Sequence, residues 1–191
     1  MEPLWVRQVP SNVSAEDSIW LKKHVHFIDW EVLTIDVAAR ASDGHPTVLR
    51  MYPLRVDPKG RGSGEPVPWV NLYFLVCPKL VQSVGRLEQA GYIDIFDKRV
   101  EENDAFAKSL VEDHKLYAEQ RWSLLSNADK EYAERKKYTT TLRETGICGM
   151  KYFKRVKCLH AHYGFYLASS KATLVGRWVE QLLKNEERGT S

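Results

Sequence analysis

An apolar, aromatic-rich run over residues 69–76 (WVNLYFLV) is followed at once by Cys77 and Pro78. A continuous apolar run of this length is typical of a buried strand, so it predicts a strand at the centre of a sheet. Proline fits the first position of a helix, because the amide hydrogen that it lacks has no partner there. Apolar residues then recur at helical spacing up to Gly91, which predicts a strand-to-helix unit with Cys77 at its turn.

The rest of the chain places strands before helices. Apolar and β-branched residues predict two further strands, and polar periodic segments predict the helices: strands at 31–39 and 47–56, and helices at 97–125, 127–143, 154–169 and 173–186. Pro53 predicts an early end or an edge position for the second strand. This order predicts an α+β fold, with a small antiparallel sheet of about three strands packed against a C-terminal helical set.

Two segments stand apart from this predicted core. Residues 1–30 read as an N-terminal extension with a short helix at 15–23, preceded by a capping box at Ser14 and Asp17. Residues 57–68 (DPKGRGSGEPVP) interleave proline and glycine with polar residues and predict a mobile loop. The remainder, 31–187, is expected to form a single domain.

Composition narrows the possible class of protein. The chain has 191 residues, of which 43% are hydrophobic, and it contains no apolar run long enough to cross a membrane. Its first residues lack the apolar region of a signal peptide. Three widely spaced cysteines argue against a disulfide framework and favour a reducing compartment. We therefore expect no membrane association and an intracellular protein, cytoplasmic by default, with an organelle left open.

Charge is distributed unevenly along the chain. Residues 94–134 carry eleven acids against six bases, whereas 136–157 carry seven bases against one acid. The basic segment suits phosphate, RNA or an acidic partner, and segments 1–30 and 94–134 are candidate docking surfaces for a protein. The alternative is that both charged stretches are solvated helix faces that compensate each other.

The densest group of reactive side chains lies in residues 157–162 (KCLHAH). In a regular helix Cys158 and His162 share one face, while His160 points elsewhere unless the first turn is irregular. Thiolate and imidazole are zinc ligands, so Cys77, Cys158 and His162 form a possible zinc set, although the spacing matches no zinc signature. Without a metal, these residues suit Cys/His chemistry. The alternative is that Cys158 packs as a small apolar residue and the histidines are hydrogen-bonded core groups.

Two further sites are candidates. The thiol of Cys77 would lie at a helix N-terminus, which favours the thiolate form, and it would need a nearby base such as His160 or His162. Gly146 and Gly149 form a loop before a helix, where backbone amides and nearby bases suit an anion. The bases that would complete such a phosphate site are Lys154, Arg155 and Lys157. Inert core packing and a solvated loop are the alternatives.

These motifs resemble a known family. Residues 68–78 (PWVNLYFLVCP), followed by Arg86-Leu87-Glu88, are similar to the P-F-P-T-L-Y-W-L-T-C-P and R-L-E motifs of the mainly bacterial DUF501 family. Residues 146–149 (GICG) and 155–160 (RVKCLH) resemble that family's second motif, G-[VI]-x-G and R-V-K-C-L-H. Val175-Gly176 stands where the family often has N-P-V-G. The family's name denotes a domain of unknown function, so the resemblance implies an architecture and a shared polar site but no reaction.

The resemblance implies which residues form that polar site: Cys77, Arg86, Glu88, Arg155, Lys157, Cys158 and His160. The chain departs from the family at one position, where Ala41 replaces the cysteine of an R-C-x-x-G-x-P motif. A metal site shared by the family's cysteines would therefore lack one ligand here, unless His45 substitutes for it.

Three functions are consistent with these patterns. The first is binding of RNA or a ribonucleoprotein assembly through the basic segment and its interleaved aromatic residues. The second is a small enzyme acting on a phosphate-bearing substrate, with Cys77 or Cys158 as nucleophile, His160 or His162 as acid and base, and Arg86, Arg155 and Lys157 as the phosphate clamp. The third is an interaction protein without chemistry. No cofactor is expected, with zinc as the alternative.

Overall fold

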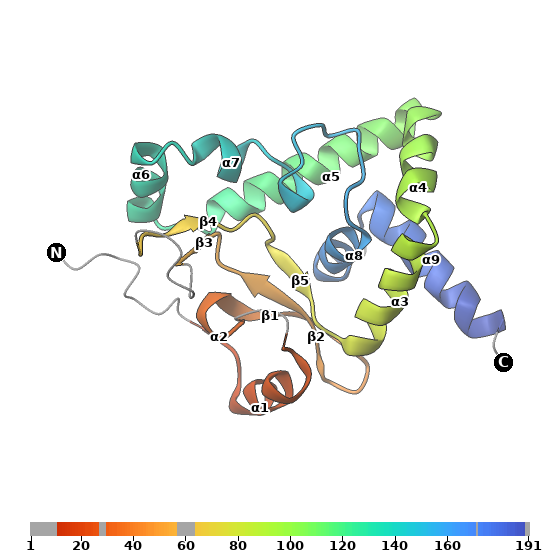
Figure 1. Cartoon of the computed structure of the whole chain (residues 1–191), viewed down its shortest axis with the longest axis horizontal. Helices are drawn as coiled ribbons and strands as arrows, with labels where there is room; N and C mark the ends of the chain where they lie inside the picture. Colours follow the sequence, from red (N-terminus) through yellow and green to blue (C-terminus); the bar gives the residue numbers. More distant parts are fainter. Residues whose placement is uncertain (1–10, 27–29, 57–63, 171, 190–191) are drawn as a thin grey trace.

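A computed structural model of the chain describes residues 11–26, 30–56, 64–170 and 172–189. Its helices are α1 (Ala15–His24), α2 (Trp30–Leu33), α3 (Pro78–Gln89), α4 (Tyr92–Glu101), α5 (Asp104–Ser123), α6 (Asn127–Arg135), α7 (Thr139–Arg143), α8 (Leu159–Ala168) and α9 (Leu174–Gly189), with a 3-10 turn, η2 (Ile147–Gly149). Its strands are β1 (Thr34–Arg40), β2 (Pro46–Met51), β3 (Leu54–Arg55), β4 (Val67–Pro68) and β5 (Tyr73–Leu75). The predicted α+β class is confirmed (Figure 1).

The main sheet has the antiparallel order β1-β2-β5, so β2 is central and β5 lies at an edge. The prediction of a central strand at 69–76 is therefore wrong, and only Tyr73–Leu75 are in the ladder. Helix α8 packs directly on β5, where a Cβ on Gly164 would lie 3.3 Å from the carbonyl oxygen of Tyr73. The apolar run is therefore buried because helices cover it, and not because strands flank it on both sides.

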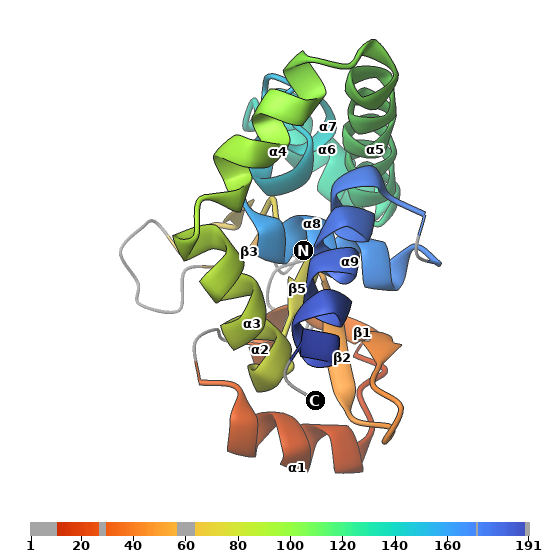
Figure 2. The same ribbon diagram turned by 90° about the vertical axis from the view of Figure 1, so that its right-hand side faces the viewer.

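Helices enclose this sheet and place α8 at the centre of the molecule. Figure 1 shows the long α5 crossing above the sheet, and Figure 2 shows α8 and α9 lying between α3 and α5. The hydroxyl of Tyr117 on α5 accepts a hydrogen bond of 2.6 Å from the backbone N–H of Leu72, and the Phe165 ring on α8 stacks on Tyr73. These four residues belong to the main core, and their contacts hold α5 and α8 against the segment that contains β5.

The N-terminal helix, α1, packs against the rest of the same chain. Ser14 caps α1 by accepting the N–H of Asp17, as the capping pattern predicts. The Asp17 carboxylate then receives two hydrogen bonds of 2.7 Å from Arg40 of β1, and Leu21 is fully buried. Of the predicted extension, residues 1–10 and 27–29 lie outside the described residues.

Several boundaries differ from the prediction. Residues 31–33 belong to the short α2, and β1 begins only at Thr34. The segment 47–56 divides at Pro53 into β2 and β3, which confirms the predicted early end. Within the predicted loop, Val67–Pro68 pair with β3, and 57–63 lie outside the described residues. Asn103 caps α5 and separates it from α4, which divides the helix expected at 97–125. In the part of the chain that the structure describes, no helix combines the length and apolarity needed to cross a membrane.

Candidate functional site

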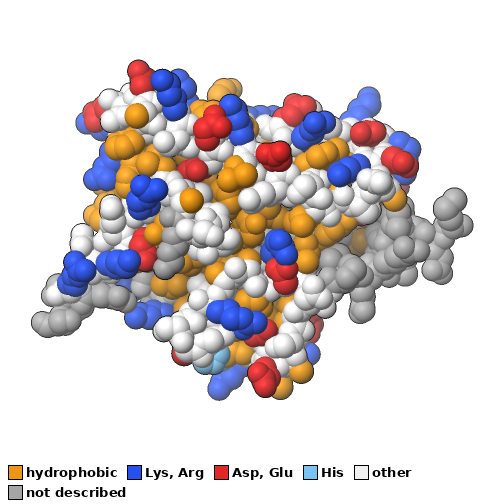
Figure 3. Space-filling model, turned by 180° about the vertical axis from the view of Figure 1, so that it is seen from behind, with side chains coloured by type: hydrophobic (Ala, Val, Ile, Leu, Met, Phe, Trp, Pro, Cys, Tyr) orange, Lys and Arg blue, Asp and Glu red, His pale blue; other side chains and the backbone are white. Residues whose placement is uncertain are grey.

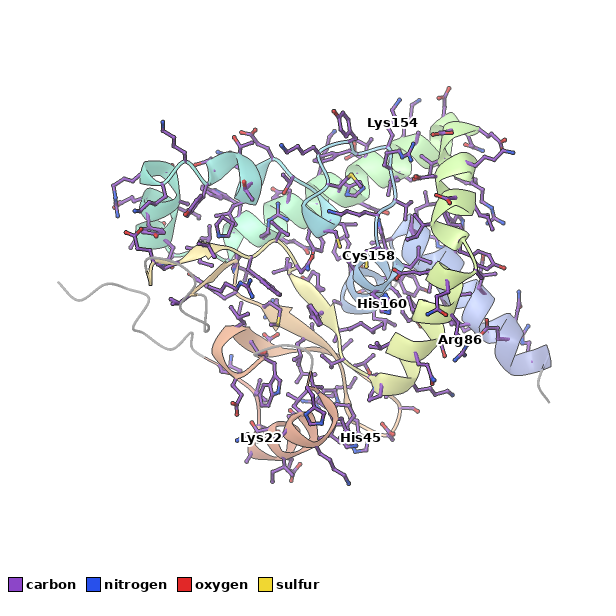
Figure 4. The ribbon with its side chains drawn as sticks, viewed as in Figure 1. Lys22, His45, Arg86, Lys154, Cys158 and His160 are labelled. Carbon is purple, nitrogen blue, oxygen red and sulfur yellow. The ribbon has the colours of Figure 1, made fainter. Side chains whose placement is uncertain are left out.

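Cys158 lies immediately before α8 rather than within it. Its backbone is extended (φ −151°, ψ 118°), and the helix begins at Leu159, not at 154 as predicted. The spacing rule for a regular helix therefore does not apply, and His160, on the first turn, turns towards α3 instead of away from Cys158. Figure 4 shows Cys158 and His160 side by side at the start of α8, facing α3.

Helix α3 holds both ring nitrogens of His160. Nδ1 lies 3.2 Å from Oε1 of Glu88, and Nε2 lies 3.0 Å from the carbonyl oxygen of Val81. Between these two partners, Gly85 presents no side chain, and a Cβ there would lie 3.9 Å from the ring. Val81, Gly85 and Glu88 follow each other at helical spacing, so one face of α3 forms the seat of the imidazole.

The carboxylate of Glu88 also closes the N-terminus of α8. Its Oε1 accepts a hydrogen bond of 2.6 Å from the backbone N–H of Leu159. Because the first amides of a helix have no partner within it, they favour an anion. The anion at this helix end is a side chain of the protein itself. Glu88 thereby ties α3, α8 and His160 together.

Cys148 brings a second thiol to the same place. It lies in η2 with a left-handed backbone (φ 55°), between Gly146 and Gly149, and its thiol is close enough to that of Cys158 for the two to perturb each other's ionisation. The ammonium of Lys157 donates a hydrogen bond of 3.3 Å to the carbonyl oxygen of Cys148. We call Glu88, Cys148, Cys158 and His160 the cysteine site.

The four side chains of the cysteine site perturb each other's ionisation. Interactions with Cys148, with His160 and with the backbone N–H of Ala161 lower the pKa of Cys158, and burial only partly opposes them. The same interaction between the two thiols, together with burial, raises the pKa of Cys148. Hydrogen bonds to Cys158 and Glu88 raise the pKa of His160 to about 10. The arrangement therefore favours a Cys158 thiolate beside a His160 imidazolium, with Cys148 as a protonated donor.

Burial alone would raise the pKa of Glu88, but its hydrogen bonds to His160 and Leu159 lower it instead. The carboxylate is thus the second negative group beside the imidazolium. One donor atom each from Glu88, Cys158 and His160 lies within 4.8 Å of the others, so these three residues are also able to hold a zinc-like ion. The donor set differs from the zinc set predicted from the sequence, because Cys77 and His162 are not members of this described group.

His162 lies in the core, not at the cysteine site. It is 1% exposed and packs edge-on against the ring of His114, and among the described residues neither of its ring nitrogens has a hydrogen-bond partner. Burial and the neighbouring His114 lower its pKa to about 3, so the ring is neutral. This placement does not suit the predicted role of acid and base. Cys77 precedes α3 as predicted, a half-buried thiol one helical turn before Val81.

The glycine loop does not present free amides to an anion. The N–H of Gly146 donates to the carbonyl oxygen of Met150, and that of Gly149 donates to the carbonyl oxygen of Gly146. The N–H of Ile147 donates to Nδ1 of His114 at 3.0 Å. The predicted phosphate cradle at Gly146 and Gly149 is therefore closed by bonds within the protein, and Glu88 occupies the N-terminus of the helix that follows.

The predicted cationic residues fall into two groups. Arg155 is neutralised, because it pairs with Asp97 at 2.8 Å and with Glu101 at 3.2 Å, and Arg86 lies 3.6 Å from Glu186. Lys157, by contrast, is exposed beside the cysteine site, and Lys154 is exposed on the loop before it (Figure 4). The cations available to a ligand are thus the lysines of this loop.

The uneven charge along the chain is partly compensated in the folded molecule. Acids of 94–134 pair with the basic segment, and on the face in Figure 3 acidic and basic side chains are interspersed around exposed apolar atoms. Among the described residues of segments 1–30 and 94–134, the exposed large apolar side chains are Ile19, Ile95 and Leu116. Docking of a protein partner there stays a prediction.

Sequence reasoning missed the residues that hold the loop of Cys148 in place. Arg121 is fully buried and donates to the backbone carbonyls of Leu142, Thr145 and Gly146, among others. His114 accepts the N–H of Ile147, as above, and its Nε2 lies 3.2 Å from the carbonyl oxygen of Arg155. An arginine in a polar helix is normally a surface residue, so no sequence signal distinguishes this one.

In a comparison with protein-family models, residues 37–181 match the family described as a protein of unknown function (DUF501). The chain belongs to the DUF501 family. The same comparisons found no match among curated proteins and none among solved structures.

The resemblance seen in the sequence is therefore confirmed. The matched range contains all of the cysteine site. It leaves out α1, whose Asp17 is hydrogen-bonded to Arg40 of β1. Glu88, Cys158 and His160 belong to the R-L-E and C-L-H motifs, so two separate DUF501 motifs meet in space at this one cluster. Cys148 occupies the unspecified position of the G-[VI]-x-G motif.

Proposed function

We propose that this DUF501 protein is an enzyme that uses Cys158 as a nucleophile on a phosphate-bearing substrate. The observation that carries this proposal is the position of the Cys158 sulfur within 4.8 Å of a ring nitrogen of His160, whose ring is fixed by Glu88 and by the Val81 carbonyl. A cysteine nucleophile requires a thiolate, and a neighbouring imidazole held by a third group is the usual way to obtain one. Glu88 is then a positioning residue.

The same contacts suggest how His160 works in two steps. While Cys158 is a thiolate, their hydrogen bond is the largest cause of the raised pKa of His160, so the ring remains protonated and serves as an acid. Once the sulfur carries a covalent group, that cause disappears and the pKa of His160 falls. The ring can then take a proton from the attacking water, which allows one residue to serve as acid and then base.

The preference for a phosphate-bearing substrate rests on Lys157, beside the site, and on the exposed lysines of the loop that precedes it. Lys157 lies against the carbonyl of Cys148, and within the described residues Lys151 and Lys154 form no ion pair. Arg86 and Arg155 were expected to clamp the phosphate, but both lie beside carboxylates. The anion-binding role therefore passes to Lys157 and its loop.

A charged and a neutral alkylating reagent test this substrate preference without knowledge of the natural substrate. We expect the ratio of the iodoacetate rate to the iodoacetamide rate to be in excess at Cys158 of the ratio for a free thiol. The reason is that the lysines attract the anionic reagent. Lys157→Gln should reduce that excess several-fold, and Lys98→Gln, on an exposed residue of α4, should leave it unchanged. An equal preference in wild type and Lys157→Gln would refute the anionic substrate.

Covalent turnover is tested with acetyl phosphate as a probe. The Cys158 thiolate attacks the acetyl carbonyl, the bond to the phosphate oxygen breaks, and the products are a thioester and inorganic phosphate. We expect mass spectrometry to find the acetyl group on Cys158 in the wild-type protein and in Cys77→Ser, and its hydrolysis to slow in His160→Gln. Acetylation of Cys77 with none on Cys158 would exclude the proposed nucleophile.

A second candidate function, RNA binding, rests on one separate observation. Tyr152 is 77% exposed and lies between Lys151 and Lys154, which combines a stacking surface with two cations. Fluorescence anisotropy with a single-stranded RNA oligonucleotide should give binding that weakens steeply with salt. Tyr152→Ala should weaken it several-fold, and Cys158→Ser should not. Binding that is absent at low salt, or unaffected by Tyr152→Ala, would exclude this role for the loop.

A further inference from the structure

We propose that Cys148 and Cys158 form a reversible disulfide when a peroxide oxidises Cys158, with Cys148 as the resolving thiol. This inference rests on the proposed function, because it uses the same nucleophilic Cys158. It extends that function by giving the second cysteine of the site a chemical role. The reaction class is a two-electron thiol oxidation at a dithiol centre.

The first argument is the placement of the two sulfur atoms. Cys148 and Cys158 are ten residues apart in sequence, yet η2 packs against α8, and the ammonium of Lys157, the residue before Cys158, lies 3.3 Å from the carbonyl oxygen of Cys148. The two thiols are close enough to perturb each other's ionisation. Both thiols are half-buried, and both pack against the main core cluster. A disulfide needs two side chains that already face each other, since a bridge between distant or diverging residues requires backbone movement.

The second argument is how firmly the chain holds Cys148 in position. Its left-handed backbone conformation is uncommon for a residue with a side chain, and it is maintained by bonds on both sides. Arg121 binds the carbonyl of Gly146 before it, His114 accepts the N–H of Ile147, and Lys157 binds the carbonyl of Cys148 itself. These bonds hold the backbone of Cys148 in place next to the segment that contains Lys157 and Cys158.

The third argument is the difference between the positions of the two thiols. Cys158 is the N-cap residue of α8, where the positive end of the helix favours an anion, and its sulfur lies within 4.8 Å of a ring nitrogen of His160. Cys148 lies in η2, outside that group of three donor atoms. An attacking thiolate paired with a protonated partner is the arrangement that sulfenate formation and resolution require. Cys77 takes no part in these contacts and serves as an internal control.

The oxidation proceeds in two balanced steps. The Cys158 thiolate attacks one oxygen of the peroxide, the O–O bond breaks, and His160 gives its proton to the leaving alkoxide or hydroxide. This step yields a sulfenic acid and an alcohol or water. The Cys148 sulfur then attacks the sulfenic sulfur, the S–O bond breaks, and water leaves with the thiol proton. The protein loses two electrons in total, and the peroxide gains them.

A bound metal is the competing use of the same side chains. Glu88, Cys158 and His160 supply three donor atoms, but Cys148 is not among the three donors that lie together. Both ring nitrogens of His160 already have partners on α3, Glu88 and the Val81 carbonyl, and a metal would have to displace one of them. The proximity of the two thiols therefore favours the disulfide, and metal retention becomes one outcome of the test.

The test treats the reduced full-length protein with one equivalent of hydrogen peroxide, followed by alkylation and peptide mapping. We expect a Cys148–Cys158 disulfide, seen as the loss of two hydrogen atoms and reversed by dithiothreitol, with Cys77 still free to react. Cys77→Ser should behave like wild type. Cys148→Ser should instead accumulate sulfenic acid on Cys158, and sulfinic acid when a second equivalent of hydrogen peroxide is added.

Three outcomes would overturn the inference. They are stable sulfenic or sulfinic acid on Cys158 in the wild-type protein, a disulfide that includes Cys77, and stoichiometric zinc in the purified protein that protects both thiols. Failure of the proposed function gives a different result. If Cys158 is modified rapidly by iodoacetamide but forms no disulfide, only this inference fails, whereas a Cys158 that reacts with neither reagent refutes the nucleophile itself.

Discussion

Nδ1 of His160 lies 3.2 Å from Oε1 of Glu88, although the two residues are 72 positions apart in the chain. The same carboxylate oxygen accepts the N–H of Leu159 at 2.6 Å. One side chain of α3 therefore fixes both the helix that follows Cys158 and the imidazole that contacts its sulfur. The reactivity of Cys158 should depend on Glu88, even though Glu88 does not itself touch the substrate.

Glu88→Gln tests that dependence. The variant keeps an oxygen acceptor for Leu159 but removes the negative charge, so the pKa of His160 should fall from about 10 and the Cys158 thiolate should lose its partner. We expect the rate of Cys158 alkylation at pH 6 to fall roughly tenfold. The exposed Glu101→Gln is the matched control, and an unchanged pH profile in Glu88→Gln would remove Glu88 from the mechanism.

Stability should fall in mild acid because of His114 and His162. Burial lowers the pKa of His114 to about 4 and that of His162 to about 3, below the unfolded value of about 6.5. The unfolded chain therefore binds more protons, and stability is lost as pH falls below about 6.5. Each histidine contributes a slope of up to roughly 1.4 kcal/mol per pH unit there. Urea unfolding at pH 7.5, 6 and 5 measures this slope.

Replacing His162 by leucine separates the contributions of the two histidines. Because neither ring nitrogen of His162 has a partner among the described residues, the apolar variant should unfold with equal or higher free energy at pH 7.5, by up to about 1 kcal/mol. Its loss of stability in acid should also be smaller. His114→Leu breaks the bonds to Ile147 and Arg155 and should be destabilising by about 2 kcal/mol. The opposite order of the two variants would contradict this account.

Arg121→Lys should destabilise the protein by about 3 kcal/mol or more. The buried guanidinium serves carbonyls from three separate stretches of chain, at Val70, at Leu142 and at Gly146, and a lysine ammonium reaches fewer of them. The exposed Arg135→Lys is the control. Thermal unfolding measures the difference. Equal melting temperatures for the two variants would show that the hydrogen bonds of the buried Arg121 guanidinium contribute little to stability.

Gly146→Ala should damage the cysteine site and stability together. A Cβ at this position would lie 2.3 Å from Nδ1 of His114, so the loop of Cys148 has to move. We expect a loss of about 2 kcal/mol in unfolding free energy and slower formation of the Cys148–Cys158 disulfide. Gly44→Ala is a poor control because of its positive φ, whereas Gly85→Ala, with 3.9 Å of clearance, should retain near-normal stability.

The class of fold could be predicted from the sequence, but the order of the strands could not. Turn signals and capping residues such as Ser126 are local, and the predicted break between α5 and α6 occurs there. The position of β5 at an edge depends instead on α8, which covers it through the close approach of Gly164. An apolar sequence indicates that a segment is buried, but it does not indicate whether helices or strands cover it.

The cysteine site was only partly predictable for a similar reason. The family motifs named Glu88, Cys158 and His160, but the helical spacing pointed to His162 as the partner of Cys158. That rule fails because Cys158 lies before α8, and the start of α8 is set by Glu88 from a different helix. The contact with Cys148 and the role of Arg121 arise from tertiary packing over long sequence separations, which no local pattern reports.

The most direct test of the central claim is the pH dependence of Cys158 alkylation in the full-length protein, with Cys77 in the same molecule as reference. Iodoacetamide labelling followed by peptide mass spectrometry gives both rates at each pH. A Cys158 that is already reactive at pH 6, with an apparent pKa well below the usual value of about 8.5, is the predicted result. An apparent pKa at or above that value would contradict the thiolate–imidazolium pair and the enzyme built on it.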